Sequence, residues 1–327
     1  MATASQITQL LESHNTGDDE RFCAVALQVA ASEARKGHSN VAKQIRSLVE
    51  RTKIEKNESE SASNISMIAE PRGDAAELFD AVVTDFKLSD LVLPKVEKDR
   101  IRRILKEQHH LSEIRSHNLP VRQRLLLTGP PGCGKTMCAS ILSNELGLPL
   151  FVIRLDSLIS RHLGESLSKI RLIFDTINQS RAVYLFDEFD SVGFQRDSDG
   201  EVGEMRRLLN LFLTYIENLS SNSLVVAATN HGDKLDNALY RRFDDLVEFK
   251  LPDEEQIQKI IEIRLASVKT SRLSWVRILK AAHSLSYAEI IRACDEAMKE
   301  KIIFRKKLVT TPMITDALKE RRLYLDR

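Results

Sequence analysis

The stretch GPPGCGKT, residues 129–136, decides the fold of this chain. It follows the apolar run RLLLTG, residues 124–129, and a helix is expected directly after it. The stretch fits the pattern G-x-x-x-x-G-K-[ST] in the context that this pattern requires, with a strand before it and a helix after it. A glycine-rich turn that served packing alone would need neither the lysine nor the threonine. We therefore predict a phosphate-binding loop.

The residue types in this loop match the chemistry of a bound phosphate. Glycine has no Cβ atom, so backbone amides can curl around an anion at Gly129, Gly132 and Gly134. Lys135 is predicted to reach the β and γ phosphates, and the Thr136 hydroxyl to ligate Mg²⁺. The following helix offers its positive N-terminus to the same anion. The other loop residues predicted to contact the nucleotide are Pro130, Pro131 and Cys133.

Several short apolar runs indicate the class of fold. They are residues 124–129, 150–156, 182–188, 223–230 and 245–252, and helix-like segments separate most of them. Continuous apolar strands that alternate with helices are typical of a parallel sheet covered on both faces. Before the first run, residues 88–108, LSDLVLPKVEKDRIRRILKEQ, are interpreted as helical. The predicted fold class is therefore α/β.

Changes in pattern along the chain suggest its division into parts. Residues 20–52 have the spacing of a helical hairpin, and a stretch rich in Ser, Glu and Asn without any period follows. Near the other end, Asp253 and Gln256 form a capping pair before a helical segment. We predict a helical N-terminal unit, a flexible linker, an α/β domain and an all-helical C-terminal unit, with the respective boundaries 1–54, 55–74, 75–252 and 253–327.

Composition limits the function classes. The chain has 327 residues and a net charge of +1, which gives no argument for binding to nucleic acid or to a membrane surface. The start, MATASQITQL, lacks the basic flank and apolar core of a signal peptide, and no apolar run approaches the roughly 18 residues of a membrane span. The spacings of the cysteines are unlike those of zinc sites: Cys23, Cys133, Cys138 and Cys294. We expect a reduced, cytoplasmic protein.

An acidic pair ends the run AVYLFDE. Asp187 and Glu188 follow a buried strand, and the carboxyl ends of parallel strands meet beside the phosphate loop in such sheets. Asp187 is predicted to hold Mg²⁺, directly or through water, and Glu188 to polarise the water that attacks the phosphate. The pair favours a hydrolase over other phosphate-loop proteins. Its alternative interpretation is an acidic strand end without a role.

Further polar residues follow the next strand. Asn230 ends SLVVAATN, where its amide could donate to the γ-phosphate or orient the water, or simply begin a turn. Arg241 and Arg242 precede the last strand, and a guanidinium aimed at a γ-phosphate stabilises charge during phosphoryl transfer. They could instead be surface arginines paired with Asp244 or Asp245.

These motifs, in this order, resemble the AAA family of ATPases. The resemblance rests on GPPGCGKT, YLFDEFD, VVAATN and NALYRRFDD and covers about residues 75–327. The branch most similar to the chain contains katanin, spastin and the proteasomal ATPases. The resemblance implies a P-loop NTPase three-layer sandwich with a five-stranded parallel sheet of order 5-1-4-3-2, followed by a helical lid. It also implies ATP and Mg²⁺ as cofactors.

The resemblance assigns roles to the residues beyond the loop. Asp187 and Glu188 become the Walker B pair, and Asn230 becomes the sensor of the γ-phosphate. Arg241 and Arg242 become arginine fingers that complete the site of the next subunit, which implies a homo-oligomeric ring, a hexamer by analogy. The lid resembles the Gly-Ala-Asp motif of this branch at Ala288 and the acidic Glu289. No arginine stands at that helix start, although Arg292 follows a turn later.

The stretch SRHLGES, residues 160–166, occupies the place of a substrate-gripping pore loop in this branch. The family pattern is basic, aromatic, aliphatic and Gly, and this chain has Arg161, His162, Leu163 and Gly164. A histidine can stack on a polypeptide, but it offers less apolar area than Tyr or Trp and can become charged near neutral pH. The alternative interpretation is a solvated loop.

Three functions remain open at this stage. The first is a ring-forming ATPase that remodels protein partners, with a protein client recruited through the N-terminal unit and gripped in the pore. The second is a loader-type ATPase directed to nucleic acid, against which the near-neutral charge and the missing lid arginine count. The third is an ATP-driven switch that scaffolds a partner enzyme without threading it, which the weakened RHLG grip favours.

Overall fold

The computed structural model describes residues 25, 73–158, 163–189, 202–232 and 237–325. The chain divides into two units at Ile68 and Ala69, and every element described below belongs to the second unit. The predicted N-terminal unit, residues 1–54, lies outside the described residues apart from position 25. Of the predicted linker, residues 55–74, only positions 73 and 74 are described, at the start of the 3₁₀ helix η1 (Gly73–Leu78).

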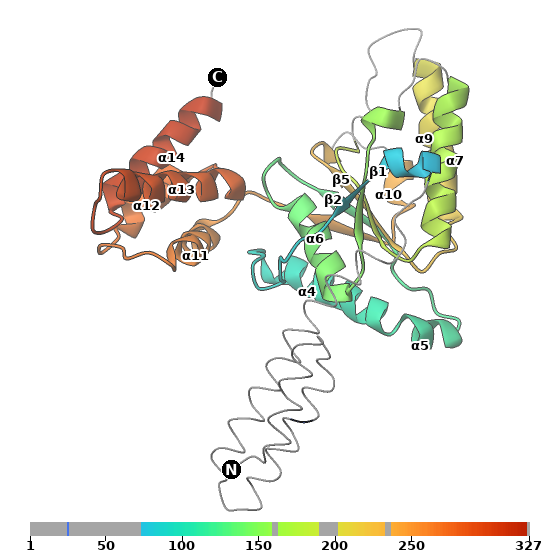
Figure 1. Cartoon of the computed structure of the whole chain (residues 1–327), viewed down its shortest axis with the longest axis horizontal. Coiled ribbons are helices and arrows are strands. Elements are labelled where there is room, and N and C mark those ends of the chain that lie inside the picture. Colours follow the sequence, from blue (N-terminus) through green and yellow to red (C-terminus); the bar gives the residue numbers. More distant parts are fainter. Residues whose placement is uncertain (1–24, 26–72, 159–162, 190–201, 233–236, 326–327) are drawn as a thin grey trace, which may run out of the picture. The chain divides into compact units, whose positions relative to one another are not determined.

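A twisted sheet forms the centre of this unit (Figure 1). Its strands run in the order β1-β3-β4-β5-β2-β6. The last five in chain order are β2 (Arg124–Thr128), β3 (Leu150–Ile153), β4 (Val183–Phe186), β5 (Leu224–Thr229) and β6 (Asp245–Glu248). All pairs among these five are parallel. Numbered by themselves from β2, they follow the order 5-1-4-3-2, so the expected parallel core is confirmed.

The sheet has a sixth strand that the sequence analysis missed. β1 (Phe79–Val82) pairs antiparallel with β3, so the sheet has one strand more than the five parallel strands that the resemblance implies. An ion pair fastens the added strand, because Arg154 Nε donates to Asp80 Oδ2 at 2.8 Å. The strand has only four residues, FDAV, and one of them is charged, so its signal is weaker than that of the longer apolar runs at 124–129, 150–156, 182–188 and 223–230.

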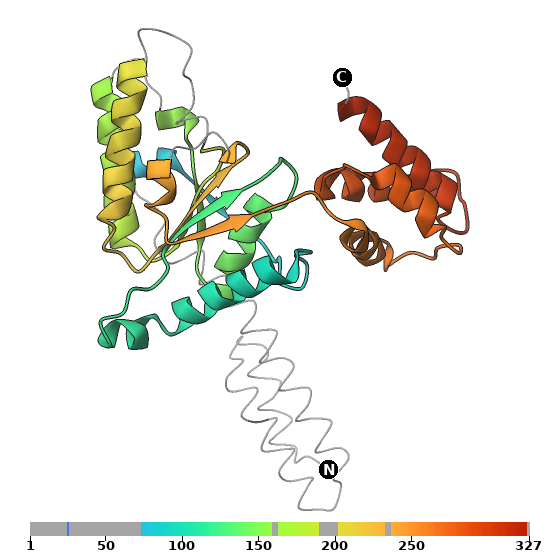
Figure 2. The same ribbon diagram turned by 180° about the vertical axis from the view of Figure 1, so that it is seen from behind.

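Helices cover both faces of the sheet and make three layers. On one face α7 (Leu163–Gln179) and α9 (Val202–Glu217) lie side by side, and on the other lie α4 (Lys95–His109) and α6 (Lys135–Leu146) (Figures 1 and 2). Alternate strand residues serve the two cores. Leu125 and Leu127 join the core beneath α4 and α6, whereas Leu126 joins the aromatic core beneath α7 and α9.

The helix expected at residues 88–108 begins later than predicted. α4 starts at Lys95, and Pro94 is its N-cap residue, with φ −54° and ψ 152°. Proline disfavours the helical conformation of the residue before it, so Leu93 cannot continue a helix into Pro94. The apolar residues before the proline form buried coil instead, with Leu91 and Val92 in the core.

Four further helices follow the sheet among the described residues, and we call them the lid helices: α11 (Glu254–Leu265), α12 (Trp275–Ala282), α13 (Tyr287–Ile303) and α14 (Thr311–Leu325). The predicted capping pair is confirmed. Gln256 N donates to Asp253 Oδ1 at 2.8 Å, and Asp253 N donates to Gln256 Oε1 at 3.1 Å. The buried Tyr287 hydroxyl also donates to Gln256 Oε1, at 2.8 Å, so the cap joins α11 to α13.

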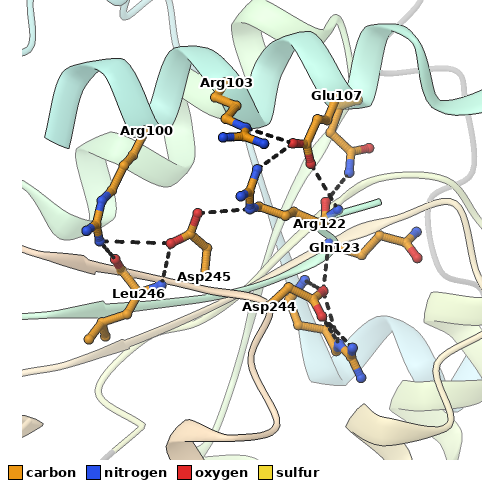
Figure 3. A network of polar contacts seen from close by, with 10 residues as sticks. Arg100, Arg103, Glu107, Arg122, Gln123, Asp244, Asp245 and Leu246 are labelled. Carbon is orange, nitrogen blue, oxygen red and sulfur yellow. Dashed lines mark hydrogen bonds and ion pairs between the residues drawn. The ribbon is translucent and has the colours of Figure 1, made fainter. Parts of the chain in front are cut away.

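A polar network fastens the beginnings of β2 and β6 to each other and to α4 (Figure 3). The Asp244 carboxylate accepts from the backbone N–H groups of Gln123 and Arg124, each at 2.9 Å, and pairs with the Arg124 guanidinium. Arg122 pairs with Asp245 at 3.0 Å and with Glu107 of α4. These contacts lie at the end of the sheet opposite the phosphate loop, since both strands begin there.

Two short helices and a further 3₁₀ turn complete the described elements: α5 (Leu111–Ser116), α10 (Asn237–Tyr240) and η2 (Asp156–Leu158). Within the described ranges, none of the helices combines the length and the apolar character that crossing a bilayer requires.

Candidate nucleotide site

The predicted phosphate loop connects the end of β2 to the start of α6. Gly129 has φ +138°, and a Cβ atom there would lie 2.0 Å from the carbonyl oxygen of Phe249. That close approach persists because Phe249 N donates to Thr128 O at 2.7 Å, which holds the two backbones together. A side chain at position 129 would collide with rigid backbone, so the turn requires glycine.

Lys135 connects the phosphate loop to Asn230, the predicted sensor residue that follows β5. Its side chain is buried, and Nζ donates to Gly129 O at 2.7 Å and to Pro130 O at 3.0 Å. A third bond, at 2.8 Å, runs to Oδ1 of Asn230, which directly follows β5. The predicted phosphate-binding lysine and the predicted sensor therefore share one place, at the carboxyl ends of neighbouring strands.

Thr136 and Asp187 form a second pair at this edge. The Thr136 hydroxyl donates to Asp187 Oδ2 at 2.6 Å, and the other carboxylate oxygen accepts from the backbone N–H of Glu188 at 2.9 Å. A hydroxyl and a carboxylate oxygen this close are the hard oxygen ligands that Mg²⁺ prefers. The donor set and the glycine-lined loop thus fit a magnesium–nucleotide complex.

Glu188 has an unusual backbone. Its φ is +49°, a left-handed conformation that costs a residue with a side chain about 1–2 kcal/mol. The next residue explains why the strain persists: Phe189 is fully buried among aromatic rings, and its N–H donates to Ala228 O at 2.9 Å. This anchor turns the chain so that the Glu188 side chain is exposed at the strand end.

The first turn of α13 meets the phosphate loop. Ala288 N donates to Gly132 O at 3.0 Å, and a Cβ atom at Gly132 would lie 2.6 Å from Ser286 Oγ. Glu289, one residue later, faces its own helices instead. It pairs with Arg321 of α14 at 2.5 Å and with Arg292 at 2.7 Å. Hydrogen bonding from Arg321 holds the pKa of the Glu289 carboxyl below its usual range.

The two predicted arginine fingers differ in their surroundings. Arg242 pairs with Glu217, the last residue of α9, at 2.5 Å, whereas Arg241 is exposed. The surface partners considered for them from sequence are wrong for Arg242, because Asp244 and Asp245 are engaged by other arginines. Both residues precede the start of β6 in the chain, and the phosphate loop follows the end of its parallel neighbour β2. Four strand residues, roughly 13 Å, separate these ends.

The cysteines of this region are core residues. Cys133 within the loop is 2% exposed, and burial raises the pKa of its thiol. Cys138 in α6 is fully buried, and burial raises its pKa to about 12. Both side chains are therefore protonated hydrophobes at neutral pH, as expected for Cys138.

The candidate pore loop is described only in part. Arg161 and His162 lie outside the described residues. Leu163 and Gly164 form the first turn of α7, although we expected them in a loop. Local side-chain contacts explain the early start, since Ser168 Oγ donates to Gly164 O at 3.0 Å and Lys169 pairs with Glu165 at 2.7 Å.

Together, the parallel strand order, the glycine-lined loop and the oxygen ligands at the strand ends define a P-loop NTPase fold. Comparison with known proteins gives the family. The profile of the AAA family, described as "ATPase family associated with various cellular activities", matches residues 125–251. A protein of Sinorhizobium fredii described as "Uncharacterized AAA family ATPase y4kL" is 36% identical over 320 residues, which cover 98% of this chain and 96% of that protein. The chain belongs to the AAA family.

Two further comparisons extend this result. A putative 26S proteasome regulatory subunit homolog of Methanothermobacter marburgensis is 29% identical over 254 residues, covering 76% of this chain and 67% of that protein. Among solved structures, the FIGL-1 AAA domain superposes with a TM-score of 0.58 at 23% identity, covering 75% of this chain and 86% of the other. At this identity, the structural match supports the fold alone.

Sequence reasoning missed the contacts that join the predicted residues. The hydrogen bond from Ala288 to Gly132 uses backbone groups, and the partner of Arg242 lies on a helix 25 positions earlier (242 − 217 = 25). Neither relation leaves a spacing signal in the chain. The resemblance of Ala288 and Glu289 to a lid motif was the one usable hint.

Proposed function

We propose that this protein is a Mg²⁺-dependent ATPase. One observation carries the proposal: Lys135 and Thr136, at the start of α6, pair at 2.8 and 2.6 Å with Asn230 after β5 and Asp187 after β4, at one edge of the sheet. A purely structural turn has no use for a buried ammonium beside two oxygen ligands. The AAA-named relative that spans nearly the whole chain supports ATP as the nucleotide.

Each residue has a distinct task in this proposal. The amides of residues 129–134 and the Lys135 ammonium bind and orient the phosphates. Thr136 and Asp187 hold Mg²⁺, which stabilises negative charge on the transferring phosphoryl group. The Glu188 carboxylate orients and polarises the attacking water, and the Asn230 amide positions that water or the γ-phosphate. The geometry favours hydrolysis because Glu188 is exposed at this same edge.

The replacement Glu188→Gln tests this assignment. The neutral amide keeps the size of the side chain but is a far weaker base, so turnover should fall at least a hundredfold. ATP binding, measured by titration with a fluorescent analogue, should change less than threefold. Glu113→Gln, at an exposed position on α5, serves as the matched control and should retain full turnover. Near-normal turnover in Glu188→Gln would refute the assigned base.

We propose further that the protein works as a homo-oligomeric ring, a hexamer, in which the arginine of one subunit reaches the nucleotide of the next. Arg241 is exposed and precedes the start of β6, whereas the phosphate loop follows the end of β2, and this supports the arrangement. In this ring, residues 75–252 are the ATPase domain and residues 253–327 the lid. Residues 1–54, joined by the linker 55–74, recruit a protein partner in the cytoplasm.

Protein partners are the proposed targets of the ring. Relatives described as proteasome regulatory subunit homologs favour a protein client over nucleic acid. Replacing His162 by Ala separates two modes of action on a client recovered with the ATP-locked Glu188→Gln variant. Loss of client processing with normal ATP turnover indicates threading through the pore. Unchanged processing indicates a switch that holds and releases its partner.

A further inference from the structure

One hydrogen bond connects the turn that carries Arg241 to the loop that follows Asn230 in the same chain. Tyr240 is the last residue of α10, and its hydroxyl donates to the carbonyl oxygen of Gly232. The contact is tightly fitted on both sides. A Cβ atom at Gly232 would lie 2.9 Å from Thr128 Cβ and 3.4 Å from the tyrosine oxygen. Gly232 is thus clamped between the last residue of β2 and Tyr240.

Both ends of this contact adjoin residues of the proposed ATPase machinery. Gly232 stands two positions after Asn230, whose side chain accepts from Lys135. Between them, His231 N donates to Thr229 Oγ1 at 3.1 Å, which stiffens the loop. At the other end, Tyr240 directly precedes Arg241, and Phe243 N donates back to Tyr240 O at 3.3 Å. The tyrosine therefore sits between the sensor and the arginine.

Arg242, the residue after Arg241, already forms an ion pair within its own subunit. The ion pair of Arg242 with Glu217 leaves the side chain of Arg242 27% exposed. Arg241 is exposed, so it is the better placed of the two to act on another subunit. Its direction depends on the turn that carries it, and the Tyr240 hydroxyl attaches that turn to the Asn230 loop.

We propose that Tyr240 is a positioning residue that orients Arg241 for its action on the neighbouring subunit. This inference rests on the proposed ring ATPase. A single hydrogen bond of this kind is worth about two- to tenfold in the population of the productive orientation. Tyr240→Phe keeps the aromatic side-chain ring, which packs against the aromatic core, and removes only the hydroxyl group.

Mixed rings of full-length variants test the proposal. The donor variant, Glu188→Gln, retains its arginines but cannot hydrolyse ATP itself. The recipient variant, Arg241→Ala, retains its base but offers no arginine. Each is inactive alone, and mixing them should restore turnover at interfaces where a donor arginine faces a recipient site. Tyr240→Phe is then added to the donor or to the recipient.

The proposal predicts an asymmetric result. Tyr240→Phe in the donor should lower the restored turnover two- to tenfold, and the same change in the recipient should have no effect. Equal losses in both positions, or no loss in the donor, would overturn the role of Tyr240. Tyr184→Phe in the donor is the matched control, because it removes a similar hydroxyl-to-carbonyl bond, to Ser180, in the same core. It should leave the restored turnover unchanged.

The mixture of Glu188→Gln and Arg241→Ala without any change at Tyr240 separates this inference from the proposed function. Absence of any restored turnover without the tyrosine change would overturn the shared active site itself, and the positioning role with it. If turnover is restored and Tyr240→Phe in the donor does not change it, the proposed ring ATPase stands and only the positioning role of Tyr240 is overturned. Thermal unfolding of Tyr240→Phe within a few degrees of the parent is required, and a large drop would count as a structural role.

Discussion

At the residue scale, the site is a set of hydrogen-bonded donor and acceptor side chains at the ends of parallel strands. The buried ammonium of Lys135 donates hydrogen bonds to backbone carbonyl oxygens and to Asn230 Oδ1, while the Thr136 hydroxyl donates one to the Asp187 carboxylate. Buried polar groups are costly unless they find such partners. These pairings hold four functional side chains in place before any phosphate is considered, which is the preorganisation that phosphoryl transfer requires.

Gly129→Ala is predicted to damage the site directly. The new Cβ atom would lie 2.0 Å from Phe249 O, so the loop must move away from β6. Nucleotide affinity, measured by titration, should fall at least tenfold. Gly147→Ala is the matched control, since it also has positive φ, +62°, but no atom lies within 4 Å of the new Cβ. It should lower stability by only about 1 kcal/mol. Equal binding losses would contradict the steric explanation.

The identities of these residues could be predicted from sequence, but their contacts could not. Lys135 and Thr136 stand in a motif whose spacing is fixed by phosphate geometry, and Asp187 and Asn230 follow buried apolar runs. The strain at Glu188 is different, because it depends on where Phe189 is anchored in the folded core. Contacts between distant segments need the three-dimensional fold.

At the element scale, β2 and β6 depend on Asp244 as a common anchor. Asp244→Ala would leave two backbone N–H groups and the Arg124 guanidinium without this acceptor. We expect a loss of about 2–3 kcal/mol in the free energy of unfolding, measured with urea. Glu248→Ala on the same strand removes an exposed pair with Lys250 and should cost less than about 1 kcal/mol. Similar losses for the two variants would contradict the anchoring role.

The junction of α13 and α14 should respond to acid. Bonding from Arg321 lowers the pKa of Glu289, whose side chain is 12% exposed, in the folded protein. A carboxyl with a depressed folded pKa adds stability above its unfolded pKa of about 4.3 and loses it as pH falls through the folded value. The stability gap between the parent and Glu289→Gln should therefore be constant from pH 7 to 5 and shrink below about pH 4. A constant gap down to pH 3 would contradict this linkage.

Elements with strong patterns were predictable, and those set by context were not. Four of the five parallel strands, β2 to β5, are largely apolar runs, and the order of all five follows once the family is recognised. β1 escaped because its residues, FDAV, gain strand geometry only by pairing with β3. The delayed start of α4 could have been predicted, because Pro94 interrupts the apolar pattern of residues 88–108.

At the scale of the whole molecule, the proposed ring would share each active site between two copies of the chain. Turnover per subunit should therefore rise with protein concentration as rings assemble, and then reach a plateau. Arg241→Ala should lower the plateau on the order of 10³-fold while preserving nucleotide binding and assembly. Arg171→Ala, an exposed arginine on α7, is the control and should behave as the parent. Concentration-independent turnover, measured together with mass by light scattering, would contradict a shared site.

The backbone of Glu188 sets thermal stability against catalytic activity when variants of the protein are selected. Its left-handed backbone is one that Gly or Asn adopts with less strain, so those residues at position 188 should raise thermal stability while removing the proposed base. A screen that rewards heat resistance alone would therefore enrich inactive variants at this position. Engineering a more durable form of the protein would have to protect Glu188 explicitly and seek its gains elsewhere in the sheet.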